Sequence, residues 1–135
     1  HHRLHENFEG IDETIALSSM YAANHLGARV VATLTQTGKT ALWMSRISSN
    51  IAIFAMSDNY KTLKKVTIYR GVYPCYIDKT SADDWNDVNS HVIENLEDRA
   101  EVNNGDIVIV TKGMHKDKSG GTNLMKILRV GDGNY

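Results

Sequence analysis

A chain of 135 residues is the size of one ordinary domain and is too short for an enzyme with a cleft between two domains. Its 15 lysines and arginines nearly balance its 16 aspartates and glutamates, and the two signs are interspersed. We therefore expect no nucleic acid and no membrane as partner, because both select basic surfaces. No apolar stretch approaches the roughly 18 residues of a membrane-spanning helix, no signal peptide is visible, and the one cysteine, Cys75, cannot form an internal disulfide, so we expect a cytoplasmic protein.

The first half of the sequence alternates segments of helical periodicity with short apolar runs. Residues 1–10 begin with two histidines that are either native or the end of a purification tag, and we expect them to be a linker or tag remnant. The domain is expected at 11–135. Gly27 can end the first helix in a left-handed cap. The predicted elements are a helix at 11–26, a strand at 30–35, a helix at 40–48 and a strand at 51–56.

The second half continues the alternation, and Pro74 indicates an edge or irregular strand. The last apolar run follows its predecessor too closely for a helical crossover, so it should lie antiparallel. We therefore predict a three-layer α/β/α domain with a mostly parallel five-stranded sheet and an antiparallel last strand. The predicted elements are a helix at 59–68, a strand at 72–77, a helix at about 84–102, a strand at 106–112 and a last strand at 124–130.

Helical spacing also predicts which side chains these helices turn inward. The residues expected on the buried faces are Ile11, Ile15, Ala16, Met20, Ala23, His25, Leu26, Leu42, Trp43, Ile47, Leu63, Val66 and Thr67.

Small and hydroxyl-bearing residues join the first predicted strand to the second predicted helix. Backbone N–H groups at a helix start have no intrahelical partner, and the helix dipole adds positive charge there, so an anion is favoured. The alternative is that the hydroxyls merely cap the helix while the lysine is solvated. The candidate phosphate-binding residues are Thr35, Gln36, Thr37, Gly38, Lys39 and Thr40.

The ending Gly38-Lys39-Thr40 invites comparison with the nucleotide-binding P-loop, which requires a glycine five residues before the second one. That position is Thr33, inside the predicted strand. A P-loop that wraps around a nucleoside triphosphate is therefore not expected. The sequence instead favours a tighter turn that binds a single phosphate.

A second polar loop, at 113–122, leaves the end of another predicted parallel strand. Ligands of open α/β sheets gather at the carboxyl ends of the strands, so the two loops could hold the two ends of a sugar phosphate. The candidates in this second loop are Lys116, Lys118, Ser119, Gly120, Gly121 and Thr122.

No catalytic constellation is apparent, and we predict no catalytic residue and no metal site in this chain. His25 and His91 stand far apart in sequence, without the clustered spacing that a metal requires. A free-standing phosphatase or phosphosugar isomerase would need a nucleophile or base near the turn, and none is present. Trp85 follows polar residues and is a candidate for stacking on a ligand.

Taken together, these segments resemble the C-terminal domain of pyruvate kinase along nearly the whole chain. Residues 15–27 (IALSSMYAANHLG) look like its opening helix, and 35–40 is similar to its effector-phosphate turn. The segments at 69–72 (YRGV), 105–110 (GDIVIV) and 120–123 (GGTN) follow in the family order. Each is weak alone, but together they are specific.

The closest likeness is to bacterial members that are activated by a sugar monophosphate or AMP. In members that respond to fructose 1,6-bisphosphate, a Trp and an Arg often hold the second phosphate. Trp85 is similarly placed, but the Arg position corresponds to His91. Both are possible effector contacts, and the histidine argues against a bisphosphate, because it is mostly neutral at pH 7 and cannot bind in a fork.

The resemblance also implies what lies outside this chain. The parent enzyme would transfer a phosphoryl group from phosphoenolpyruvate to ADP in glycolysis, with Mg and K held by a barrel domain that is missing here. The fragment, with no cofactor of its own, should be inactive. The parent would be a tetramer, in which this domain contacts a neighbouring subunit. The alternative is an assembly module, possibly a dimer, whose effector site is vestigial and whose last strand and first helix make the subunit contact.

Overall fold

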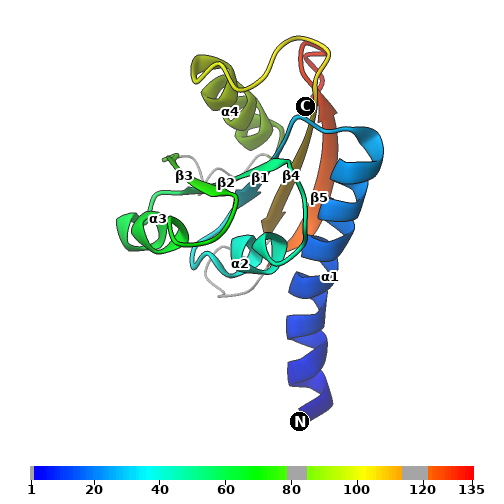
Figure 1. The fold of residues 1–135 in the computed structure, drawn as a ribbon, viewed down its shortest axis with the longest axis vertical. Helices are drawn as coiled ribbons and strands as arrows, with labels where there is room; N and C mark the ends of the chain where they lie inside the picture. Colours follow the sequence, from blue (N-terminus) through cyan, green and yellow to red (C-terminus); the bar gives the residue numbers. More distant parts are fainter. Residues whose placement is uncertain (1, 79–84, 114–121) are drawn as a thin grey trace.

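A computed structural model of the chain describes residues 2–78, 85–113 and 122–135 (Figure 1). The side chains described are those of 10–78, 87–113 and 122–135. A five-stranded sheet in the order β3-β2-β1-β4-β5 forms its centre, and all neighbouring pairs are parallel except β4 and β5, which are antiparallel. The strands are β1 (Val30–Leu34), β2 (Ala52–Ser57), β3 (Val72–Tyr76), β4 (Ile107–Gly113) and β5 (Thr122–Arg129). The predicted fold class is confirmed.

Helices cover both faces of this sheet, which makes the three predicted layers (Figure 1). One face packs against α4, whose Val88, Val92 and Leu96 are fully buried. The other face packs against α1, α2 and α3 through residues such as Met20 and Met44. The helices are α1 (His2–Leu26), α2 (Lys39–Ser45), α3 (Tyr60–Val66) and α4 (Trp85–Asp98).

The unbroken apolar character of the central strands follows from these two covered faces. In β1, Val30, Ala32 and Leu34 point toward α4, whereas Val31 points toward the other helices. Because successive side chains of a strand alternate between faces, a strand covered on both sides must be apolar at nearly every position. All five residues of β1 are accordingly buried.

Several predicted helix boundaries differ from the observed ones. The first helix begins at His2 rather than at residue 11, so most of the segment expected as a linker or tag remnant is helical, and this end of α1 projects beyond the rest of the domain (Figure 1). The last helix ends at Asp98 rather than near residue 102. There Ala100 adopts a left-handed backbone with φ of 58°, and the Glu101 N–H donates to the Leu96 carbonyl, which turns Val102 into the core.

The inward faces of the helices were predicted only in part. Ala16, Met20, Ala23, Leu63 and Val66 are buried as expected. The prediction was wrong for residues at the margins, because a helix end or a terminal turn extends past the sheet that would cover it. The exposed exceptions are Ile11, His25, Leu26 and Thr67; Ile15, Leu42, Trp43 and Ile47 are half-buried, and α2 instead buries Thr40, Ala41 and Met44.

Candidate functional site

The 35–40 turn begins where β1 ends and leads directly into α2. The Thr35 N–H donates to the Met56 carbonyl, the last bond to the neighbouring strand. Two hydroxyls then fold back on the turn: Thr35 Oγ1 accepts from the Gly38 N–H at 2.8 Å, and Thr37 Oγ1 accepts from the Lys39 N–H at 3.3 Å. They occupy the N–H groups of Gly38 and Lys39, but the N-cap residue of α2 is Gly38, which makes no side-chain cap. Each hydroxyl still has its own proton to donate to a ligand.

Three other backbone donors of the turn have no partner among the described residues. The N–H groups of Thr37, Thr40 and Ala41 make no hydrogen bond within the part of the chain that the structure describes. Thr40 and Ala41 lie in the first turn of α2, and both residues are buried. Half-buried Lys39, the first residue of α2, adds an ammonium group at the same place. The turn therefore offers amide, hydroxyl and ammonium donors together, a set suited to a phosphate.

Gly38 is required by the shape of this turn. Its φ is 82°, a left-handed value that side chains other than glycine rarely adopt. A Cβ at this position would also lie 2.8 Å from Cγ1 of Val66 on α3, closer than real contacts come. The turn and α3 thus approach each other at a distance that only a glycine allows.

Residues of α3 form a wall of the turn that the sequence analysis did not include. The Thr62 hydroxyl donates to the Gln36 carbonyl at 2.5 Å, across 26 residues of sequence. Lys65 lies close by, with Cε 3.8 Å from the position of a Gly38 Cβ. Asn59 caps α3 by accepting from the N–H groups of Lys61 and Thr62, which signals in the sequence where the helix begins but not that it lies against the turn.

The two predicted loops meet at one point that the structure describes. Thr122, the first residue of β5, shares a hydrogen bond of 2.7 Å with Thr40 through their hydroxyl oxygens, and both residues are buried. This contact ties the start of α2 to the end of the 113–122 loop; the carboxyl-edge argument predicted the nearness of the two loops. The remaining candidates of that loop, Lys116, Lys118, Ser119, Gly120 and Gly121, lie outside the described residues.

Thr33, which argued against a P-loop, belongs to the interior of the sheet. It pairs in register with Thr111 of β4, and the Thr111 hydroxyl donates to Thr33 Oγ1 at 2.8 Å. Both side chains are fully buried. The strand therefore continues past the position where a P-loop would already have left the sheet, and only the short 35–40 turn remains.

The candidate contacts on α4 are not brought to the turn by any described interaction. Trp85 is the first residue of α4, but its side chain lies outside the described set. His91 is half-buried, and its carbonyl accepts from the Asn95 side chain at 2.9 Å. No hydrogen bond or ring contact among the described residues joins His91 to residues 35–40.

Cys75 is a core residue and not a reactive thiol. It is buried in β3 within the cluster beneath α4, and burial raises the pKa of its thiol, an effect only partly opposed by the nearby Arg99 guanidinium.

Among the described residues, no group of three His, Cys, Asp or Glu side chains could hold a metal ion. Within the same residues, no helix is long and apolar enough to cross a membrane.

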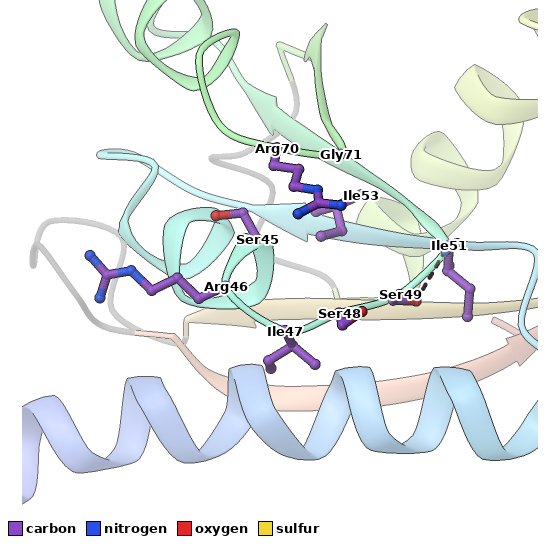
Figure 2. Close-up of a pocket in the computed structure, with 9 residues that line it drawn as sticks. All are labelled: Ser45, Arg46, Ile47, Ser48, Ser49, Ile51, Ile53, Arg70 and Gly71. Atoms are coloured by element: carbon purple, nitrogen blue, oxygen red, sulfur yellow. Dashed lines mark hydrogen bonds between the residues drawn. The ribbon is translucent and has the colours of Figure 1, made fainter.

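A second hollow lies at the opposite edge of the sheet, where β2 and β3 begin. Its cavity volume is about 110 Å³. Arg70 extends over Ile53 at its upper rim, whereas Arg46 points away from the other lining side chains and lies over the Trp43 ring at 5.0 Å (Figure 2). Two of its serine hydroxyls already donate within the protein, Ser45 to the Leu42 carbonyl and Ser49 to Asn24. Both of these hydroxyl protons are therefore already used within the protein.

Residues 13–128 match the family model described as the alpha/beta domain of pyruvate kinase. The chain belongs to the pyruvate kinase family. The match covers β1 to β4, nearly all of β5, and the 35–40 turn.

Relatives named pyruvate kinase agree with this assignment. The chain is 48% identical over 130 residues to the pyruvate kinase of Buchnera aphidicola subsp. Schizaphis graminum, which covers 96% of this chain and 27% of the relative. It is 45% identical over 130 residues to pyruvate kinase II of Salmonella typhimurium, with the same coverage of 96% and 27%. The pyruvate kinase of Clostridium acetobutylicum is 30% identical over 115 residues, 85% of this chain and 24% of the relative. The chain therefore spans about a quarter of the length of these pyruvate kinases.

Proposed function

We propose that this chain is the allosteric effector-binding domain of a pyruvate kinase and that the 35–40 turn holds the phosphate of its effector. The observation that carries the proposal is the Thr40–Thr122 hydrogen bond, which joins the donor-rich turn to the end of the 113–122 loop. A phosphate ester between the two would meet donors from both. The effector class is a sugar monophosphate or AMP.

The reaction itself belongs to the rest of the protein. We propose that the whole protein transfers a phosphoryl group from phosphoenolpyruvate to ADP, with Mg and K bound outside this chain, and that this chain alone is inactive. Its role is then to change the equilibrium between two arrangements of the enzyme. An effector does so by binding one arrangement better than the other by about 1 to 3 kcal/mol. The single, buried cysteine fits a reducing cytosol as the compartment.

Subunit assembly is a second role, favoured by a different surface. β5 is an edge strand of the sheet, and its Ile127 is 47% exposed. Ile127 pairs with Ile109, whose side chain lies on the face of the sheet that α1 covers, so Ile127 lies on that face too. On the neighbouring α1, Leu17 and Tyr21 are also exposed. An unpaired strand edge beside exposed apolar side chains is suited to contact with a second copy. The two roles are compatible within one oligomeric enzyme.

Removal of the Lys39 ammonium tests the effector role. Titration calorimetry of the chain with glucose 6-phosphate, ribose 5-phosphate, AMP and fructose 1,6-bisphosphate should identify at least one binder. Lys39→Ala should weaken that binding about tenfold or more, because hydrogen bonds to charged groups contribute about 1.5 to 3 kcal/mol.

The matched control is Lys64→Ala, which removes an exposed lysine of α3. It should leave the affinity unchanged. Equal weakening by both substitutions would point to general charge attraction and would contradict a phosphate seat at the 35–40 turn. Absence of binding heat with all four compounds, in a chain that is folded by circular dichroism, would contradict it as well.

A further inference from the structure

The hydrogen bond from Thr62 to the Gln36 carbonyl fixes one peptide plane of the 35–40 turn. Thr62 is buried, at 5% exposure, and its hydroxyl reaches across from α3 to a carbonyl that precedes α2. This carbonyl belongs to the peptide between Gln36 and Thr37. The direction of the bond therefore sets the direction of that whole peptide, since a peptide unit is planar and rigid.

In a trans peptide the carbonyl and the N–H point in opposite directions, and the structure contains no cis peptide bond among its described residues. Because the Gln36 carbonyl points toward α3, the Thr37 N–H points away from α3. β1 lies between β2, which leads into α3, and β4, which leads into the 113–122 loop. Thr40, which follows the turn, contacts Thr122 on the β4 side of β1.

The Thr37 N–H makes no hydrogen bond to another described residue. A hydroxyl bond to its carbonyl also polarises the peptide, which makes the N–H a better donor. Two further contacts accompany this bond: Asn59 caps the start of α3, and Gly38 lies close to Val66 of the same helix.

We propose that Thr62 is a positioning residue of the phosphate site, whose hydrogen bond to the Gln36 carbonyl aims the Thr37 N–H at the bound phosphate. The inference rests on the proposed effector role of the turn and adds α3 to its machinery. Anion binding at the turn and the position of α3 are then coupled through a single hydrogen bond.

The test compares three variants of the chain. Thr62→Val removes the hydroxyl with little change of shape, and Thr62→Ser restores it. Thr67→Val is the matched control, because the Thr67 hydroxyl donates to the Lys64 carbonyl at the exposed end of the same helix and does not contact the turn. Inorganic phosphate and glucose 6-phosphate are the probes, with affinity measured by calorimetry and the Thr37 amide followed by nitrogen-15 NMR.

Thr62→Val should bind both probes about tenfold more weakly than the unsubstituted chain, equivalent to about 1.4 kcal/mol. The shift of the Thr37 amide signal on saturation with phosphate should shrink in this variant. Thr62→Ser and Thr67→Val should both bind as the unsubstituted chain does. A role of Thr62 in folding alone would lower the melting temperature without moving the Thr37 signal of the bound state.

Equal affinity and an equal Thr37 shift in Thr62→Val would overturn this inference and leave the proposed function standing. Equal weakening by Thr62→Val and Thr67→Val would also overturn it, because the loss would then follow from the stability of α3. Failure of the unsubstituted chain to bind either probe would overturn the proposed function and this inference with it.

Discussion

Two structural constraints act on Gly38, one on its backbone conformation and one on the space around its α-carbon. Its backbone is left-handed, and its α-carbon faces Val66 with no room for a methyl group. The first constraint arises within the turn, whereas the second arises from α3. A substitution at Gly38 therefore disturbs both the turn and its packing partner.

Gly38→Ala should lower the free energy of unfolding by about 2 to 4 kcal/mol, the sum of left-handed strain and overpacking. Gly27→Ala is the control, since Gly27 has a φ of 66° but nothing within 4 Å of a Cβ. It should cost only the strain, about 1 to 2 kcal/mol. Urea unfolding of the two variants measures the difference, and equal losses would show that the contact with Val66 is unimportant.

The sequence could indicate the candidate site residues that are contiguous in the chain, but not Thr62, which comes from a later helix. Residues 35–40 are contiguous, so their hydroxyls and lysine could be read as one group. The role of Thr62 was not predictable, because its bond to Gln36 depends on how α3 is placed after the crossover through β2. The contact of Thr40 with Thr122 spans 82 residues and was not itself predicted. Only the nearness of the two loops was expected, since parallel strands bring their carboxyl ends to one edge.

The bounds of the strands that are covered by helices on both faces of the sheet agree closely with the bounds predicted from the sequence. Strands β1, β2 and β4 begin and end within one residue of their predicted bounds, because uninterrupted apolar runs leave little choice of position. The helices were less well bounded. The start of α1 carries Leu4, Phe8 and Ile11 at helical spacing, a signal that the predicted start at residue 11 left unused. The helix α4 ends at Asp98, shortly before the left-handed Ala100, and alanine gives no sequence signal for such a stop.

The surface shared by α1 and β5 makes a prediction about oligomeric state. We expect the chain to form dimers in light scattering, with Ile127 of the edge strand in the contact. Ile127→Lys should convert them to monomers, because a charge would be buried without a partner. Ile68→Lys places the same charge on an 81% exposed isoleucine just after α3 and should leave the dimer intact. A monomeric unsubstituted chain, or a dimer that tolerates Ile127→Lys, would contradict assembly through β5.

At the scale of the whole molecule, the sheet separates two edges with different chemistry. The carboxyl edge carries the 35–40 turn, α3 and the Thr40–Thr122 bond, whereas the amino edge carries the hollow beneath Arg70. Both could attract an anion. Among the described residues, the carboxyl edge has a lysine as the first residue of a helix, next to amide groups that bond to no other described residue.

A crystal structure of the chain grown with glucose 6-phosphate or AMP tests the central claim most directly. We predict that the phosphate lies within hydrogen-bond distance of the Thr37 and Thr40 N–H groups and the Lys39 ammonium, with the 113–122 loop on its other side. A phosphate bound against Arg70 in the amino-edge hollow, or no ligand at the 35–40 turn in a crystal saturated with both compounds, would contradict the account.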